Sequence, residues 1–268
     1  MAIITISRGT FAGGQLLAEL LAERLGYRQI SRELLYDTVH QSYGFTTEEV
    51  VKTMDRPPGS LHHVGEHRRR LLIAVQAALC DLVQDGEVVY HGQMGHLLLP
   101  QITHVLRIRL IAPRARRMEM AMDRESINRY EAGSRIDRVD AERSRWTQFV
   151  FGTNWADPSR YDMVLNLETM SVEEAADVVV ATASLACFQP TTESQMELSD
   201  LTLTARVRAM LMADPATADL ELKVEVTEGE VKLWGIADAG LLERVTEQIC
   251  AADGVQGVST ANRRKKKR

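Results

Sequence analysis

Residues 3–15 read IITISRGTFAGGQ and lead into an apolar-striped stretch over residues 16–25. The β-branched run at the start predicts a buried strand. The leucines of residues 16–25 recur with helical spacing, with Glu19 and Glu23 on the opposite face. A strand, a glycine-containing loop and a helix in this order point backbone N–H groups and the start of a helix at a phosphate. The stretch therefore predicts a phosphate-binding loop.

The loop departs from the phosphate-loop consensus G-x-x-x-x-G-K-[ST] at the lysine. Gly13 takes the second glycine of that consensus, Gly14 takes the lysine position and Arg8 takes the first glycine. Gln15 and Leu16 fall where the metal-binding hydroxyl belongs. By the consensus alone, the match fails at its most diagnostic residue.

A family resemblance accounts for the missing lysine. The pattern ITISR…GG…LA…LAERLGY within residues 3–27 resembles the cytidylate kinase-like branch of the P-loop nucleoside monophosphate kinases. That branch writes its loop as SRxxGSGG and also lacks the lysine, whereas this chain has Phe11 for the first loop glycine and Ala12 for the serine. Residues 151–166, FGTNWADPSRYDMVLN, are similar to the branch as well. The resemblance covers residues 1–188 and implies a P-loop NTPase-type α/β fold.

The order of the predicted elements favours the same fold. Short apolar strands at residues 27–30, 88–90, 105–111 and 163–167 follow the first strand and alternate with helical segments. Such alternation predicts a five-stranded parallel sheet with helices on both faces. A capping-box pattern at residues 171–174 opens a closing helix that we expect to reach Cys187.

The resemblance also implies how ATP and Mg²⁺ would be used. The loop backbone would cradle the donor phosphates, with Arg8 replacing the lysine charge, and a lid of arginines in residues 136–143 would neutralise the transferred group. Without the family context, such a charged helix is more often a solvated surface. The implied cofactor-binding residues are Ala12, Gly13, Gly14, Gln15 and Leu16, and the implied catalytic residues are Arg8, Arg138 and Arg143.

The implied acceptor is a nucleoside monophosphate, most simply CMP or dCMP. By the resemblance, its binding residues are Ser31, Arg32, Gly92, Gln93 and Asp162. Related sequences usually carry aspartate at the position of Ser31 and arginine at that of Gln93. A helix N-cap is an equally good interpretation of Ser31. Gln93 carries no charge, and a charge-assisted arginine–phosphate contact is roughly twice as strong as a neutral one.

Composition limits the class of protein. With 268 residues, of which 45% are hydrophobic and 26% charged, the chain is typical of a globular protein with one large or two modest domains. A net charge of −5 implies no overall affinity for nucleic acid or anionic membrane.

Cys80, Cys187 and Cys250 lie far apart in apolar patterns, which predicts buried free thiols and a reducing compartment. With no cationic start before an apolar segment and no membrane-length apolar run, we expect a cytoplasmic protein.

Residues 55–65 are rich in proline, glycine and histidine and predict a mobile loop over the acceptor site. His63 and His67 have the i, i+4 spacing that suits a metal on a helix, but no further ligand lies near them, so we predict no metal site. Three arginines at residues 68–70 are either phosphate contacts or a solvated face.

A second module follows residues 189–197, which are polar and predict a linker. From residue 198 the patterns predict a helix, two strands, a helix and a strand. This αββαβ order, with VKLWG in a strand and GVQGV near the end, resembles the BON domain over residues 198–262. The resemblance implies a small α+β domain that binds a phospholipid or a small molecule. Residues 263–268, RRKKKR, predict a solubilising basic tail or a contact with anionic lipid or nucleic acid.

Two functions follow from these patterns. The first is an ATP-dependent nucleoside monophosphate kinase with a BON module for ligand sensing or docking. The alternative is a catalytically degenerate nucleotide sensor that signals through the BON module. It draws on the missing lysine, on the missing hydroxyl residue after it and on Gln93. A structural or membrane-docking role is a third hypothesis. The expected partners include a second copy of the chain but no specific nucleic acid.

Overall fold

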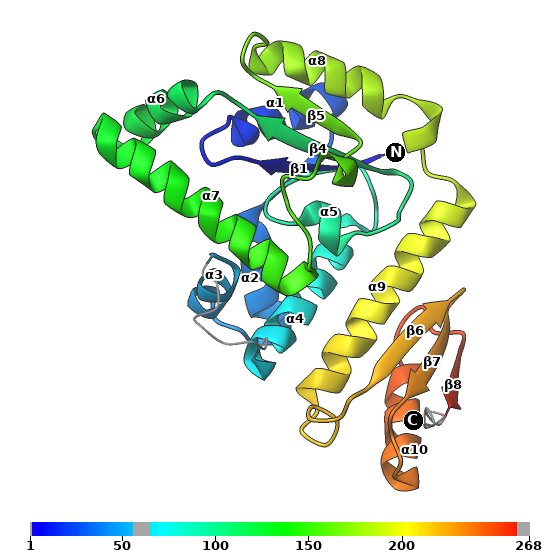
Figure 1. Ribbon diagram of the computed structural model, residues 1–268. Helices are drawn as coiled ribbons and strands as arrows, with labels where there is room; N and C mark the ends of the chain where they lie inside the picture. Colours follow the sequence, from blue (N-terminus) through cyan, green and yellow to red (C-terminus); the bar gives the residue numbers. More distant parts are fainter. Residues whose placement is uncertain (1, 56–64, 262–268) are drawn as a thin grey trace. The chain divides into compact units, whose positions relative to one another are not determined.

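The computed structural model describes residues 2–55 and 65–261 of the chain (Figure 1). It divides into two compact units. The first takes residues 1–65 and 85–190, and the second takes residues 66–84 and 191–268. The chain therefore leaves the first unit for a single helix and then returns to it.

The elements of the first unit are β1 (Ile3–Arg8), α1 (Gly14–Leu25), β2 (Arg28–Ser31), α2 (Arg32–Tyr43), α3 (Thr47–Asp55), β3 (Val88–His91), α5 (Gly95–Leu98), β4 (Val105–Ile111), α6 (Arg114–Glu125), α7 (Arg129–Phe151), the 3₁₀ turn η1 (Pro158–Arg160), β5 (Met163–Asn166), α8 (Val172–Ala183) and the 3₁₀ turn η2 (Ala186–Phe188). Those of the second unit are α4 (Glu66–Val83), α9 (Thr192–Ala213), β6 (Lys223–Thr227), β7 (Glu230–Trp234), α10 (Ala239–Cys250) and β8 (Gly257–Ala261).

The sheet of the first unit has the strand order β2-β3-β1-β4-β5, and each neighbouring pair runs parallel. Right-handed crossovers in this order put α1 on one face and the later connections on the other. In Figure 1, α1 and α8 lie on one side of the sheet and α2 and α5 on the other. The predicted five-stranded parallel sheet with helices on both faces is confirmed.

The core of the first unit joins the central strands to α1 and α8. Ile4 and Ile6 of β1 pack in one buried cluster with Leu17 and Leu21 of α1 and Val179 of α8. Burying each such side chain contributes about 1.5–3 kcal/mol. Because β1 is the central strand, this packing fixes its carboxyl end and the loop that follows.

The second unit pairs α4 with α9 and adds a three-stranded sheet in the order β6-β7-β8. Strands β6 and β7 form an antiparallel hairpin, whereas β7 and β8 run parallel. Val207 and Leu211 of α9, Val231 of β7, and Val245 and Ile249 of α10 lie in its buried cluster. The predicted helix–strand–strand–helix–strand order is observed.

Three sequence expectations differ from the structure. Helix α8 ends at Ala183 rather than at Cys187. Helix α9 begins at Thr192, inside the predicted linker, because Thr191 accepts a hydrogen bond from Ser194 N and the Ser194 hydroxyl accepts one from Thr191 N. Of the cysteines, Cys80 is buried, but Cys187 and Cys250 are exposed, so the prediction of three buried thiols is wrong for two of them.

Some expectations fall outside the described residues: most of the predicted loop at 55–65, including His63, and the basic tail at 263–268. Within the described residues, none of the helices combines the length and apolar character needed to cross a bilayer.

Candidate phosphate-binding site

The loop between β1 and α1 leaves backbone N–H groups open at the start of α1. Gly13 adopts φ +85°, a left-handed conformation that favours glycine, and no side chain caps the helix. Among the described residues, no hydrogen bond engages the amides of Gly13, Gly14, Gln15 or Leu16. The amide of Ala12 instead donates to the Gly9 carbonyl oxygen at 3.1 Å and closes the turn. Free amides at a helix N-terminus form an anion-binding site.

Arg8 lies against this helix start. A Cβ atom added at Gly14 would lie 2.0 Å from Cδ of Arg8, so only glycine at position 14 leaves room for the Arg8 side chain in its observed position. Burial and, after it, the charge of Arg143 lower the pKa of Arg8 to about 10, so the group is still cationic at neutral pH. No carboxylate of the described residues forms an ion pair with it. The charge of Glu33 acts on Arg8 without an ion pair, so an anion at the loop would meet a guanidinium group that has no paired carboxylate among the described residues.

A cavity of 830 Å³ opens over the loop and contains most of the residues predicted for the donor side. Its lining includes every implied cofactor-binding residue, 12–16, together with four arginines from separate elements: Arg8, Arg32, Arg124 and Arg143. Guanidinium groups recognise phosphate oxygens through paired N–H donors. The cavity thus combines open amides with several cations.

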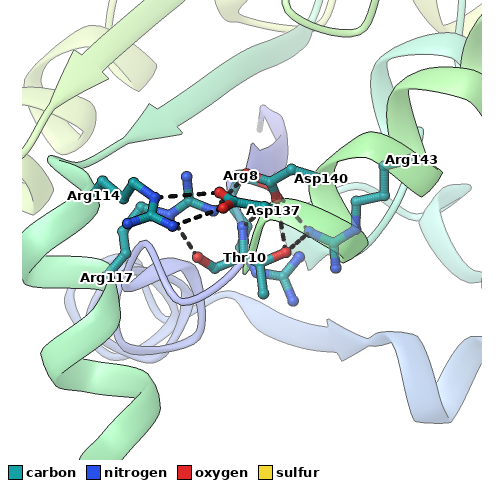
Figure 2. Close-up of polar contacts among 7 residues, drawn as sticks. All are labelled: Arg8, Thr10, Arg114, Arg117, Asp137, Asp140 and Arg143. Carbon is teal, nitrogen blue, oxygen red and sulfur yellow. Dashed lines mark hydrogen bonds and ion pairs between the residues drawn. The ribbon is translucent and has the colours of Figure 1, made fainter. Parts of the chain in front are cut away.

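Helices α6 and α7 are tied to the loop through Thr10. Figure 2 shows Arg117 of α6 and Asp140 and Arg143 of α7 around this residue. Asp140 Oδ1 accepts from Thr10 N at 3.1 Å and from Thr10 Oγ1 at 2.8 Å. Arg117 Nε donates to the Thr10 carbonyl oxygen at 2.7 Å, and its Nη2 lies 2.5 Å from Asp140 Oδ2. Arg143 Nη1 donates to Thr10 Oγ1 at 3.0 Å.

Phe11 adds an apolar tie between the loop and these helices. Its ring packs against a cluster of Met118 and Ala121 of α6 and Ala132 and Ile136 of α7. Phe11 itself has φ +58°, an uncommon conformation for a non-glycine residue. This aromatic side chain therefore holds the loop against α6 and α7.

The two predicted lid arginines differ in position. Arg143 lines the cavity, whereas Arg138 does not and lies 3.8 Å from Glu142 on an exposed part of α7. Their separation of five residues turns them about 140° apart around the helix, so both cannot face the loop. Arg124 of α6 reaches the cavity instead and donates to Gln15 Oε1 at 2.9 Å.

The predicted acceptor residues divide between neighbouring cavities. Arg32 lines the large cavity, and Ser31 lines an adjoining one of 410 Å³ that shares Gln15, Glu33 and Arg124 with it. The Ser31 hydroxyl accepts from Leu34 N at 3.1 Å, so the N-cap interpretation is confirmed.

Gly92 and Gln93 line a third cavity of 20 Å³, together with Arg8, Arg143 and Trp155. The Tyr90 hydroxyl donates to the Gln93 carbonyl oxygen at 3.1 Å. A cavity of this volume holds about one water molecule. This part of the site is closed in the structure.

Asp162 lines neither the large nor the small cavity. It precedes β5, and its Oδ2 accepts from Arg107 N at 2.7 Å and lies 3.7 Å from the Arg107 guanidinium. The structure gives this carboxylate a role in fixing β5 beside β4, and does not bring it to the other predicted residues.

A buried polar network lies beneath the small cavity. The Tyr161 hydroxyl is 2.7 Å from the Trp155 carbonyl oxygen, 3.2 Å from Ser7 Oγ and 3.2 Å from His96 Nε2. Arg109 Nη1 donates to the same carbonyl at 2.7 Å and stacks 4.3 Å from the centre of the Trp155 ring. Burial and, after it, nearby arginines lower the pKa of His96 to about 3, so its imidazole is neutral.

Sequence patterns missed four residues of the site: Arg117, Arg124, Asp140 and His91. His91 ends β3, lines the large cavity and has its pKa lowered by burial and by Arg8. Its position after a buried strand was the available signal, since ligands of open α/β sheets bind at the carboxyl ends of strands. Nothing in the sequence distinguished Arg117 or Asp140 from other charged residues of α6 and α7.

These residues fit the phosphates of ATP. The open amides, the space over Gly13 and Gly14 and the nearby guanidinium groups meet the needs of a polyphosphate. Within residues 2–55 and 65–261, no three acidic, histidine or cysteine side chains gather as metal ligands. Mg²⁺ is usually held by one or two carboxylates with substrate phosphates, and Glu19, Glu33, Asp123 and Glu125 line the cavity.

Comparison with known proteins agrees with this geometry. Residues 3–169 match the model of the cytidylate kinase-like family. The cytidylate kinase of Methanopyrus kandleri is 27% identical over 183 residues, 67% of this chain and 91% of the relative. That of Pyrococcus horikoshii is 25% identical over 179 residues, 67% of this chain and 86% of the relative. A solved structure from Eubacterium ventriosum shares the fold, with a TM-score of 0.54, 20% identity and coverage of 68% of this chain and 97% of its own. The chain, matched over more than half its length, belongs to the cytidylate kinase-like family.

Proposed function

We propose that the protein is an ATP-dependent phosphotransferase that moves the γ-phosphoryl group to a nucleoside monophosphate, CMP, dCMP or a related acceptor. The observation that carries the proposal is the set of open amides at residues 13–16 beside Arg8, which has no carboxylate partner among the described residues. ATP supplies the transferred group, and Mg²⁺ neutralises its phosphates.

The residues of this chain divide the work of positioning and charge neutralisation. The amides of Gly13 to Leu16 hold the donor phosphates, and Arg8 takes the place of the usual lysine. Arg143 and Arg124, on the two lid helices, neutralise the transferred group. Arg32 and Gln93 meet the acceptor phosphate from the ends of β2 and β3. Such contacts give most of the catalysis in phosphoryl transfer.

Coupled ADP release with a panel of nucleoside monophosphates tests this function. We expect turnover with at least one acceptor, and a loss of about 100-fold or more in Arg8→Ala. Arg145→Ala is the matched control. Arg145 is exposed on α7, two residues from Arg143, and within the described part of the chain it donates only to the Ala141 carbonyl oxygen of its own helix. No turnover with any acceptor would reject the proposal.

The second candidate is a nucleotide sensor without kinase activity. It is favoured by the 20 Å³ cavity at Gly92 and Gln93, which leaves no room for an acceptor in this conformation. Tight ATP binding without ADP release would support it. In both cases we propose that residues 198–262 are a BON-like module for docking, with a phospholipid or small-molecule ligand, and that the protein acts in the cytoplasm.

A further inference from the structure

The second unit has a cavity of its own, of 220 Å³. Its walls come from α4, α9 and the segment that leads into β6, residues 217–224. The apolar part of the lining consists of Ile73, Leu211, Met212, Leu220 and Leu222. All of these residues belong to the second unit.

The charged residues that line this cavity are three cations, Arg69 of α4, Arg208 of α9 and Lys223 of β6, and one carboxylate, Glu66, at the start of α4. Arg208 is half-buried, and among the described residues its Nη2 donates only to the Val224 carbonyl oxygen, at 3.4 Å. Burial lowers the pKa of Arg208, and the charge of Arg69 lowers it further, which places the two cations within electrostatic reach of each other. Like charges that converge beside an apolar wall raise the free energy of the folded state unless an anion joins them.

The nearby carboxylates are already engaged. Arg70 pairs with Glu66 and lies 3.6 Å from Asp219, and Lys223 pairs with Glu225. Neither Arg69 nor Arg208 forms an ion pair with a carboxylate of the described residues. The charge of Glu225 acts on Arg208 without an ion pair, so within the described part of the chain both guanidinium groups lack a paired carboxylate.

We propose that this cavity binds a phosphate monoester that carries a small apolar substituent. A phosphate monoester is close to a dianion at neutral pH and offers three acceptor oxygens, which suits two guanidinium forks. The leucine-lined wall takes the substituent. A volume of 220 Å³ lies below the usual range of about 300–1,000 Å³ for drug-sized ligands, so a nucleotide is too large. The site is separate from the phosphate loop and stands whether or not the chain is a kinase.

Amide chemical shifts of the full chain, titrated with phenyl phosphate, test the proposal. We expect saturable shifts at residues 217–224, with the dissociation constant raised at least about tenfold in Arg208→Gln and in Arg69→Gln. Arg206→Gln, which changes the same charge two residues away on α9, should bind like the wild type, since Arg206 pairs with Asp81 instead. Arg8→Ala keeps the shifts at 217–224 and removes those at the phosphate loop.

Shifts confined to residues 9–16, or unchanged affinity at 217–224 in both Arg208→Gln and Arg69→Gln, would overturn the proposal. Equal affinity for benzoate, a monoanion, would overturn the choice of a dianion. If Arg208→Gln fails to fold, the dissociation constant for phenyl phosphate is measured instead in Arg69→Gln, at the exposed rim of the cavity, and in Arg208→Lys. Unchanged affinity in both variants would then overturn the proposal.

A phosphate monoester has two sources, and vesicles separate them. Sedimentation of the full chain with phosphatidic acid vesicles, but not with phosphatidylcholine vesicles, and its loss in Arg208→Gln would assign the site to a lipid headgroup. Binding of phenyl phosphate without sedimentation would assign it to a free ester.

Discussion

Asp140 accepts two hydrogen bonds from Thr10, one from the backbone N–H at 3.1 Å and one from the hydroxyl at 2.8 Å. The residues are far apart in sequence, yet the contact joins α7 to the phosphate loop. Asp137, one turn earlier on α7, makes a similar ion pair with Arg114 but does not touch the loop. This pair of aspartates offers a matched comparison.

Asp140→Asn should lower the free energy of unfolding by about 1–3 kcal/mol, because the new amide group faces Arg117 and leaves a partly buried cation without its partner. Asp137→Asn removes an exposed pair and should change the stability little. Urea unfolding of both variants measures the difference. Equal losses would mean that the contact with Thr10 adds nothing to the fold.

Gly14→Ala should displace Arg8, since the added Cβ would lie 2.0 Å from Cδ of Arg8. We expect the affinity for ATP to fall at least about tenfold while the helix still forms, because alanine is a good helix former. Gly240→Ala is the control: it lies in the first turn of α10, where the nearest atom to the new Cβ is Asp238 Oδ1 at 3.6 Å. Calorimetric titration with ATP makes the comparison, and wild-type affinity in Gly14→Ala would argue against Arg8 as a phosphate ligand.

His96 should make the stability of the first unit depend on pH. Its pKa is lowered from 6.5 to about 3 by burial and nearby arginines, so the unfolded chain binds a proton that the folded chain does not. The contribution of neutral His96 to the free energy of unfolding is fully present above pH 6.5 and is lost as pH falls toward 3. The free energy of unfolding changes by at most about 1.4 kcal/mol per pH unit from this group. Urea unfolding from pH 7 to 4 should show a shallower slope in His96→Gln than in the wild type. The same slope in both proteins would exclude His96 as the source.

Arg109→Gln should destabilise the first unit by about 2–4 kcal/mol. The variant loses the charged hydrogen bond to the Trp155 carbonyl oxygen and the stacking on its ring, at a position only 8% exposed. Arg160→Gln, at an exposed arginine of η1, is the control. Urea unfolding followed by tryptophan fluorescence reports on both; similar unfolding curves would show that Trp155 is held by other contacts.

The sequence predicted most of the first unit because its signals are local. The β-branched run of β1, the leucine spacing of α1 and the capping box at Ser171 each specify an element from neighbouring residues. Thr191 was missed for a related reason: its partner in the cap is Ser194, and two hydroxyl residues in a polar stretch resemble a linker. Only the hydrogen bonds reveal the cap.

The site was predicted in part. The loop residues and Arg143 were found because the family pattern names them, but Arg138 on the same helix points elsewhere. A charged helix without an apolar stripe gives no signal of which side meets the loop. Arg117 and Asp140 depend on a contact across more than 100 residues to Thr10, and no local pattern encodes such a contact.

Helix α4 lies in sequence between the two segments of the first unit but belongs to the second unit. This arrangement limits where the chain can be cut to obtain either unit alone. A protein cut after residue 190 would keep α4 but lose α9, the helix with which it pairs, and would carry an orphaned amphipathic helix prone to self-association. Clean separation requires two excisions and a splice that joins residue 65 to residue 85. The two units therefore cannot be exchanged as independent segments of sequence. A recombinant that replaces only residues 191–268 would keep an α4 that does not match the new α9.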